Sequence, residues 1–368
     1  MKTRVILLTL AITGLALDAR AAVTNPVVAC ATTTLYATVT DPTTLSFAPD
    51  GTLYTGRDNA GSGGTSADAV KIHRIGPGGT PVTEFGNATI RDPDAVVVDV
   101  AGIVSGIPGS VLVGGVDSGV SGRVARIAPD GTVTSLFGPS AAIENPTKFL
   151  FTAPGRLLFT DYNNLNVMVM TNATPQLFCA TPDAPFSLAQ DGLGRVLVSS
   201  GTASQVRLYS AAGVLLSNVF VTAQARSPLA RGPGNAWGTN VYFVATNGAL
   251  QSVSPAGVVA EHGTGFAPFE DMEFGPDGAL YLCDLHSDVV LRVSPPDCRP
   301  RLDIAPLPGA VRLTWMTNAT GYLLETNSAL TLPAGWGVLT SNYSILYTNY
   351  AVTNALGGAT RFYRLHKP

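Results

Sequence analysis

The stretch Pro42–Thr55 reads PTTLSFAPDGTLYT. It consists of a proline, a short strand-like run, a Pro-Asp-Gly turn, and a second, more apolar strand-like run. Proline presets φ and glycine tolerates positive φ, so this turn chemistry suits a tight connection between two strands. The phrase recurs about every 45 residues, with its proline at Pro42, Pro93, Pro146, Pro185, Pro228 and Pro268. Such a period is typical of propeller blades, and it predicts an all-β fold, a six-bladed β-propeller over residues 30–298.

The composition agrees with many short strands joined by turns. Charged residues make up 13% of the 368 residues, and the chain has 39 glycines and 26 prolines. The length leaves room for one large domain and a small one. The net charge of −3 argues against a nucleic-acid partner, because such a partner requires a basic patch.

The N-terminus reads as a secretory signal over residues Met1–Ala21. Lys2 and Arg4 form a basic start, Val5–Leu17 an apolar middle, and Ala19–Ala21 a small-x-small cleavage site. The apolar stretch is too short to span a bilayer comfortably, and no other membrane span is predicted. We therefore expect a secreted protein, either extracellular or periplasmic.

The sixth copy of the phrase lacks its last strand. After Val293 the chain continues with Ser294-Pro295-Pro296, whereas an unassigned strand-like segment, Thr32–Val39, precedes the first copy. We expect this N-terminal strand to complete the sixth blade, which would remove both open sheet edges at once.

That closure would bring two cysteines together. The N-terminal strand would run antiparallel to its neighbour, so Cys30 would lie beside Cys298. We predict a disulfide between them in an oxidising compartment. A bridge between Cys283 and Cys298 is the alternative.

Residues 303–368 have a different pattern. Short alternating runs, beginning with Ala310–Trp315 and ending with Arg361–Leu365, predict a small C-terminal β-sandwich. This part is similar to the immunoglobulin-like or fibronectin-like modules found at the C-terminus of secreted bacterial proteins. Trp315 and Trp336 are expected to face its core, with stacking on sugars as the alternative.

In a propeller, the start of the first strand of each blade and the connection after the second strand lie on one face, around the channel mouth. This rule predicts a top-face site made of Asp58, Asp94, Asp117, Lys148, Asp161, Asn163, Glu270, Asp271, Asp284 and His286. Several oxygen ligands at one mouth would suit Ca²⁺, with Asp94, Asp161, Glu270 and Asp284 as candidate metal ligands. Alternatively, carboxylates in such loops are solvated or cap turns.

The phrase Phe274–Asp284, FGPDGALYLCD, resembles those of the NHL-repeat and senescence-marker/gluconolactonase-like six-bladed propellers, and the resemblance covers residues 30–298. It implies a metal at the mouth, held by a Glu, an Asn and an Asp, that polarises a lactone carbonyl. Asp94 falls on a matching position, but Thr147-Lys148 stands where an Asn would, and Glu270 comes one residue late. Lys148 is then expected to pair with Glu270 and fill the channel. Streptogramin-lyase-like propellers use a His and a Glu, and His286 with Glu270 is the nearest match.

Three functions follow from this reading. The first is a secreted ligand-binding or protein-interaction module that takes a small molecule, glycan or protein on its top face. The second is a calcium-dependent hydrolase or lyase of the gluconolactonase-like class. The third is a structural extracellular protein. The sequence shows no Ser-His-Asp order, zinc-type Cys/His spacing or phosphate-binding glycine loop.

Overall fold

A computed structural model describes residues 25–58, 69–118, 121–152, 155–267, 269–297, 300–317, 321–330, 335–339, 343–347, 349–355, 357 and 360–367. The predicted signal Met1–Ala21 lies outside these residues. The described residues form strands, turns and irregular segments without any helix, which confirms the all-β prediction. They accordingly include no helix long and apolar enough to cross a membrane. The chain divides into two compact units, Met1–Pro296 and Asp297–Pro368.

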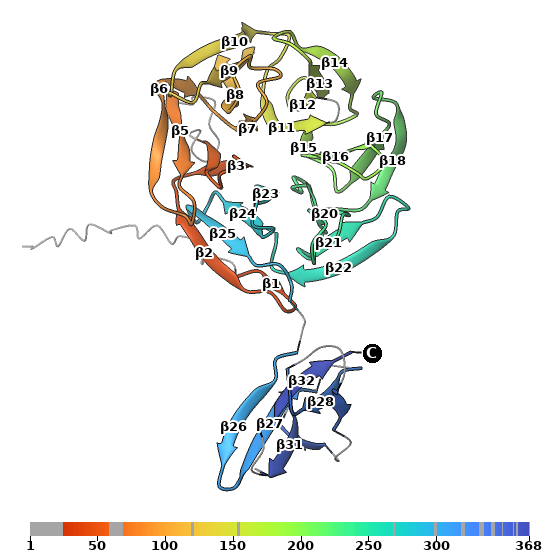
Figure 1. Ribbon diagram of the computed structural model, residues 1–368. Coiled ribbons are helices and arrows are strands. Elements are labelled where there is room, and N and C mark those ends of the chain that lie inside the picture. The colour runs from red at the N-terminus through yellow and green to blue at the C-terminus, as the bar shows by residue number, and fades with distance from the viewer. Residues whose placement is uncertain are drawn as a thin grey trace, which may run out of the picture. The chain divides into compact units, whose positions relative to one another are not determined.

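The first unit consists of six antiparallel sheets, numbered here in chain order and arranged around a common centre (Figure 1). Each of the first four sheets takes four strands that are consecutive in the chain. Sheet one has β3 (Pro42–Phe47), β4 (Leu53–Arg57), β5 (Ala69–Ile75) and β6 (Val82–Arg91), and sheet two has β7 (Ala95–Asp99), β8 (Ser110–Ser118), β9 (Ser121–Ile127) and β10 (Val133–Ser140). Sheet three has β11 (Pro146–Thr152), β12 (Arg156–Asp161), β13 (Asn166–Met170) and β14 (Gln176–Ala180), and sheet four has β15 (Pro185–Gln190), β16 (Val196–Ser200), β17 (Val206–Tyr209) and β18 (Leu215–Val221).

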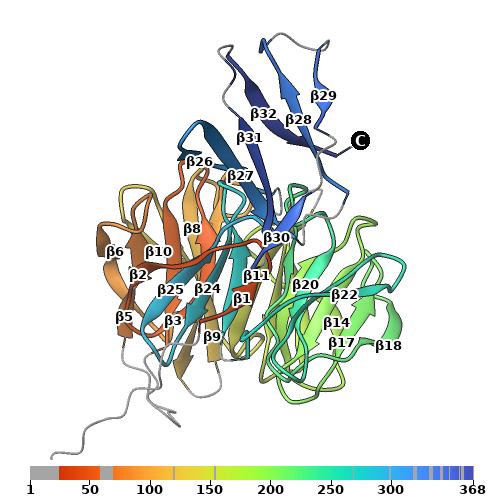
Figure 2. The same cartoon turned by 90° about the horizontal axis from the view of Figure 1, so that it is seen from below.

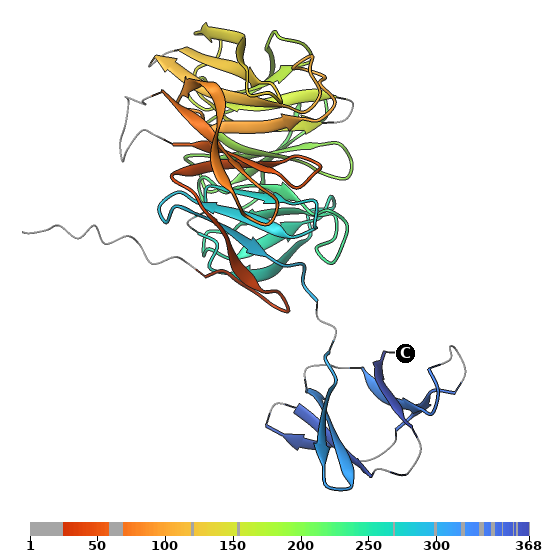
Figure 3. The ribbon, with the colours of Figure 1, turned by 60° about the vertical axis from the view of Figure 1, so that its left-hand side comes forward.

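The last two sheets of this unit also take strands from the N-terminus. Sheet five has β19 (Ala230–Arg231), β20 (Val241–Val244), β21 (Leu250–Val253), β22 (Val259–Thr264) and the short strand β1 (Val27–Val28). Sheet six has β23 (Asp271–Phe274), β24 (Leu280–Asp284), β25 (Val289–Val293) and β2 (Thr33–Thr38). The pairing of β2 with β25 is the one predicted for the N-terminal strand, and the two strands lie side by side (Figures 1 and 3). The pairing of β1 with β22 was not predicted, so the N-terminal segment joins two sheets rather than one.

The core of the first unit is divided among six apolar clusters, each shared by two neighbouring sheets. One of them joins the two ends of the series, because Leu45 and Leu53 of sheet one pack with Tyr281 and Val290 of sheet six. Each sheet therefore buries both of its faces against neighbours, as the repeat predicts.

The predicted disulfide is only partly described. Cys30 is disulfide-bonded, whereas Cys179 and Cys283 carry free thiols. Cys298 lies outside the described residues, so its pairing with Cys30 stays a prediction. The free thiol of Cys283 removes support for the alternative bridge.

The second unit consists of two antiparallel sheets. One has β26 (Asp303–Leu307), β27 (Ala310–Met316), β31 (Asn349–Ala355) and β30 (Ser344–Leu346), and the other has β29 (Gly337–Val338), β28 (Leu323–Asn327) and β32 (Phe362–His366) (Figure 2). Trp315 and Leu324, one from each sheet, pack in a single apolar core, and Trp315 is 1% exposed. Trp336 is only half-buried, and the guanidinium of Arg364 lies 4.3 Å from its ring centre.

Candidate functional site

A small pocket opens where the first strands of five sheets begin. Its lining comes from the starts of β3, β11, β15 and β23, from the residues directly before β7 and β23, and from three connecting loops. The lining residues are Thr43, Thr44, Asp58, Asp94, Thr147, Lys148, Phe186, Ser187, Arg226, Glu270, Asp271 and Leu285. Strand starts and parts of the connecting loops therefore line one pocket.

Five of the ten predicted site residues line this pocket, namely Asp58, Asp94, Lys148, Glu270 and Asp271. The other five, Asp117, Asp161, Asn163, Asp284 and His286, are not among its lining residues. Asp117 belongs to β8, but its side chain lies outside the described part of the structure.

Two of the predicted metal ligands instead organise turns. The Oδ1 atom of Asp161 accepts hydrogen bonds from the backbone N–H groups of Glu144 and Asn145 at 3.0 and 2.9 Å, and its Oδ2 atom accepts one from Asn164 at 2.8 Å. The Oδ1 atom of Asp284 accepts from the N–H groups of His286 and Ser287, at 3.0 and 3.1 Å. Both carboxylates are buried, so these internal donors replace water around them.

Asn163 and His286 are exposed. The Nδ2 atom of Asn163 donates a hydrogen bond to Glu144 at 3.0 Å, on the outside of the pocket. His286 does not line the pocket, so the predicted pair of His286 with Glu270 is not formed by the described residues.

The mouth contains an ion pair that the sequence did not reveal. The Nη2 atom of Arg226 donates a hydrogen bond to Oε2 of Glu270 at 3.0 Å, and its guanidinium lies 4.7 Å from the ring centre of Phe186. The Arg226 side chain is 53% exposed, whereas that of Glu270 is 19% exposed. A guanidinium held by a carboxylate and an aromatic ring is fixed in direction, and among the described residues it has N–H groups left to meet a ligand.

Next to this pair, three aspartates crowd together. Burial, followed by the nearby carboxylates of Asp92 and Asp58, raises the pKa of Asp94 well above its usual value. Burial and the charge of Asp58 also raise the pKa of Asp92 to about 6, and its Oδ1 atom is buried without a hydrogen-bond partner among the described residues. A carboxyl group in a pocket whose pKa is raised by burial and neighbouring carboxylates marks a candidate functional site.

The backbone of Asp94 is held firmly in place. The hydroxyls of Thr43 and Thr44 donate hydrogen bonds to its carbonyl oxygen at 2.8 and 2.7 Å. Both threonines are buried at the start of β3, so sheet one holds the residue that directly precedes β7 in place at the pocket. The Asp94 carboxyl group is thereby presented to the pocket from a rigid support.

The described residues do not fit the metal that the family resemblance implies. They contain no group of three or more His, Cys, Asp or Glu side chains placed to hold a metal ion. Of the four predicted ligands, Asp161 and Asp284 bind backbone amides and Glu270 binds Arg226, so the four are not brought together.

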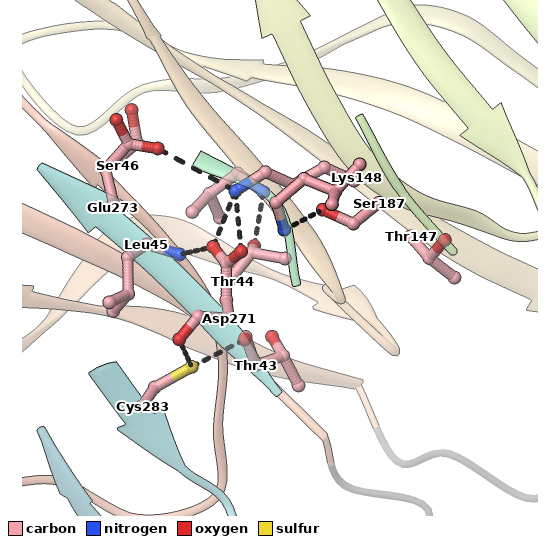
Figure 4. Close-up of polar contacts among 12 residues, drawn as sticks. Thr43, Thr44, Leu45, Ser46, Thr147, Lys148, Ser187, Asp271, Glu273 and Cys283 are labelled. Carbon is pink, nitrogen blue, oxygen red and sulfur yellow. Dashed lines mark hydrogen bonds and ion pairs between the residues drawn. The ribbon is translucent and has the colours of Figure 1, made fainter. Parts of the chain in front are cut away.

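Below the mouth, the channel is closed by a buried ion pair (Figure 4). The Nζ atom of Lys148 on β11 contacts both carboxylate oxygens of Asp271 on β23, at 2.8 and 2.6 Å. Lys148 and Asp271 are 4% and 1% exposed. The predicted pairing of Lys148 with Glu270 is therefore wrong, although the lysine does fill the channel. Successive residues of a strand point to opposite faces, and the one that faces Lys148 is Asp271, not Glu270.

The pair is supported from two further directions. The backbone N–H of Leu45 donates a hydrogen bond to Oδ2 of Asp271 at 2.8 Å, and Glu273 lies 3.8 Å from the lysine nitrogen. Burial alone would lower the pKa of Lys148, but the two carboxylates more than offset this and raise it. Lys148 therefore stays charged in the channel.

The residues that the sequence missed are Arg226, Phe186 and Asp92. Arg226 precedes its repeat proline by two residues, in a loop where it adopts a φ of 59°, and no strand pattern marks it. Phe186 directly follows its repeat proline, as Asp94 does, so its place in the repeat could have identified it.

The crowded aspartates predict an unusual pH dependence. Because the folded-state pKa of Asp92 is about 6, above the unfolded value of 3.8, the folded state binds more protons between those pH values and loses stability as the pH rises through them. Asp92→Asn should therefore raise the free energy of unfolding by about 1–2 kcal/mol at pH 7.5, after allowance for screening, and leave it nearly unchanged at pH 4. Urea denaturation at several pH values measures this.

Asp130→Asn is the control for that experiment, because hydrogen bonds from Thr132 lower the pKa of Asp130. The contribution of Asp130 to stability is present at neutral pH and is lost on acidification. This pH dependence is opposite to the one expected for Asp92. If Asp92→Asn and Asp130→Asn changed the free energy of unfolding by equal amounts at pH 4 and at pH 7.5, this result would contradict the crowding of carboxyl groups at the mouth.

Comparison with known proteins gives a fold and no family. No protein-family model matches the chain, and no curated protein matches it. Among solved structures, a gluconolactonase from Xanthomonas campestris is 13% identical, with a TM-score of 0.56 over 72% of this chain and 89% of that chain. The PQQ-bound aldose sugar dehydrogenase from Streptomyces coelicolor is 13% identical, with a TM-score of 0.51 over 72% and 98%. At such identities the likeness shows the β-propeller fold alone.

Proposed function

We propose that the chain is an exported six-bladed propeller that binds a small polar molecule at its mouth pocket and carries an immunoglobulin-like module at its C-terminus. Six sheets joined by a closed series of six apolar clusters support the blade number. The two sheets of the second unit, which share one core, support a sandwich. The signal-like segment Met1–Ala21 supports export.

The observation that carries the proposal is the meeting of Arg226, Glu270 and Asp94 in one pocket. A guanidinium offers paired N–H donors, a carboxylate oxygen accepts, and a raised pKa favours the protonated form of Asp94, which also donates. Adjacent hydroxyl groups of a sugar or related polyol need such mixed partners. The pocket is concave and has a few converging polar groups, which suits a small molecule rather than a protein surface.

The test is a thermal-shift screen of the full chain against monosaccharides and sugar lactones, followed by calorimetry of any hit. A ligand that binds only the folded protein at 100 times its Kd should stabilise it by about 2.7 kcal/mol. Arg226→Met and Asp94→Asn are each expected to weaken binding of the hit at least about ten-fold, because each leaves a ligand group unpaired.

Arg292→Met is the matched control, because Arg292 forms a similar ion pair with Asp277 at 2.7 Å that does not line the pocket. It should leave binding unchanged. Equal losses in the control and the pocket variants would remove the mouth as the binding site, and the absence of any hit would favour a structural extracellular role.

A hydrolase or lyase of the gluconolactonase-like class is the second candidate. The raised pKa of Asp94 favours it, because a raised pKa favours the protonated form that a general acid needs. The structural likeness to a gluconolactonase adds the fold to this argument.

Ring opening of a sugar lactone, followed by acid release, distinguishes the two candidates. An enzyme should show turnover that falls at least about a hundred-fold in Asp94→Asn. Addition of Ca²⁺ or a chelator tests the metal: a metal-dependent enzyme gains thermal stability with the ion and loses it with the chelator. A lactone that binds without ring opening would support the binding function and contradict the hydrolase function.

A further inference from the structure

Acidic groups outnumber basic groups in the lining of the mouth pocket. The charged lining residues are Asp58, Asp94, Glu270 and Asp271 on the acidic side and Lys148 and Arg226 on the basic side. A cleft lined mainly by one sign of charge concentrates ligands of the opposite sign. The pocket should therefore distinguish between cationic, neutral and anionic ligands of similar size and shape.

Both basic groups are already held by carboxylates. The Nζ atom of Lys148 contacts the two carboxylate oxygens of Asp271 at 2.8 and 2.6 Å, and Lys148 is 4% exposed. The Nη2 atom of Arg226 donates a hydrogen bond to Oε2 of Glu270 at 3.0 Å. Neither base therefore offers an uncompensated positive charge to a ligand anion.

The carboxyl group of Asp94 is not held in this way. Its backbone carbonyl accepts hydrogen bonds from Thr43 and Thr44, and its backbone N–H donates to the carbonyl oxygen of Asp92 at 2.9 Å. The described residues give its carboxyl oxygens no hydrogen-bond donor, although the residue is half-buried and lines the pocket. A donor on a ligand would therefore supply an interaction that the protein itself does not make.

The neighbouring carboxyl group of Asp92 adds to the acidic excess. Its Oδ1 atom is buried without a hydrogen-bond partner among the described residues. Burial and then the nearby carboxylates raise the pKa of Asp92 and that of Asp94, because like charges oppose one another's ionisation. A positive charge brought in by a ligand would relieve this repulsion.

Two kinds of cation can supply such a charge, a metal ion or an organic ammonium group. The part of the chain that the structure describes contains no group of three or more His, Cys, Asp or Glu side chains placed to hold a metal ion. An ammonium group requires less of the protein, because one carboxylate can accept from it while its other N–H groups meet hydroxyl oxygens or water. The pocket therefore favours the ammonium group.

We propose that the ligand of the mouth pocket is an amino sugar or a related amino polyol, whose ammonium group pairs with Asp94 while its hydroxyl groups contact Arg226 and Glu270. This inference rests on the proposed function, because it names the chemical class of ligand at the same site. A sugar acid is the disfavoured ligand, since its carboxylate would face the carboxyl groups of the lining.

The test compares four hexoses by calorimetry on the full chain, at about pH 7, where an amine of the α-amino type is largely protonated. The four are glucosamine, N-acetylglucosamine, glucose and glucuronate. Glucosamine should bind at least about ten-fold more tightly than glucose or N-acetylglucosamine, because a charge-assisted hydrogen bond is the stronger one. Glucuronate should bind most weakly. Raising the salt from about 0.02 M to about 0.3 M should weaken the binding of glucosamine more than that of glucose.

Two pocket variants should change the preference for glucosamine over glucose in opposite directions. Asp94→Asn should reduce it to less than about two-fold, because the ammonium loses its carboxylate. Arg226→Met should increase it by at least about three-fold, because the carboxylate of Glu270 is left without its guanidinium. Asp130→Asn, at an exposed position outside the pocket lining, is the control and should leave the preference unchanged. General damage to the fold would lower all affinities together and would not reverse these ratios.

Equal affinities for glucosamine and glucose, or tighter binding of glucuronate than of glucosamine, would overturn the proposal and leave the mouth as a site for sugars. A preference for glucosamine that persists in Asp94→Asn would overturn the assignment of the ammonium to Asp94. If none of the four hexoses bound, this inference and the proposed sugar-binding function would fail together.

Discussion

Replacing Lys148 with methionine is expected to lower the free energy of unfolding by about 3–5 kcal/mol. The reason is the carboxylate left behind: Asp271 is 1% exposed and would keep backbone donors such as the N–H of Leu45 in place of the lysine. An uncompensated charge in a closed channel costs far more than the pair itself contributes. Chemical denaturation with matched m-values measures the loss.

The double variant Lys148→Met, Asp271→Leu separates the two effects. With both charges removed, the stability should return to within about 1–2 kcal/mol of the wild type, because apolar replacements of a buried ion pair are often neutral. Lys71→Met on β5, whose lysine is partly exposed, is the matched control and should cost less than about 0.5 kcal/mol. A Lys148→Met protein as stable as this control would show that Asp271 is not charged in the folded state.

Replacing Gly56 with alanine is expected to cost about 3 kcal/mol and to disturb the mouth pocket. A Cβ atom on Gly56 would overlap the carbonyl oxygens of Pro93 and Asp94 and the hydroxyl of Thr43. Two of these three are backbone atoms, so they cannot rotate away. The alanine would push the Asp94 segment off β4 and break its hydrogen bond from Thr43.

Two measurements check this second prediction. Denaturation gives the stability, and ligand affinity at the mouth should fall at least about ten-fold, because the Asp94 carboxyl group moves with its backbone. Gly337→Ala is the control, since a Cβ atom there meets nothing within 4 Å. Unchanged affinity in Gly56→Ala would show that the position of Asp94 does not matter for binding.

The repeat predicted the ring because its signals are local and repeated. The position of the proline and the Pro-Asp-Gly turn identify the first two strands of a sheet. Because the last copy lacks a strand after Val293, Thr32–Val39 was the strand-like segment left to complete the sixth sheet, and β2 (Thr33–Thr38) does complete it. The short pairing of Val27–Val28 with β22 has no such signal, because two residues carry no periodicity.

The site was harder to predict because the repeat does not indicate the direction in which each side chain points. Asp161 and Asp284 each end a second strand, where a carboxylate can face the channel or cap the following turn, and both cap turns. For Lys148, one residue of strand register decides between Glu270 and Asp271 as its partner. Arg226 lies in an irregular loop outside every strand pattern.

The hydrogen bonds between Thr32 and Ser294 join residues 262 positions apart in the chain. A growing polypeptide therefore holds β2 without a partner until β25 has been made, almost at the end of the first unit. Because such distant pairing is slow to form, we expect folding of this unit to finish only after β25 has been made, with joining of its two ends as the late step. A chain released before Val293 would retain an open, unpaired edge, which is a template for aggregation.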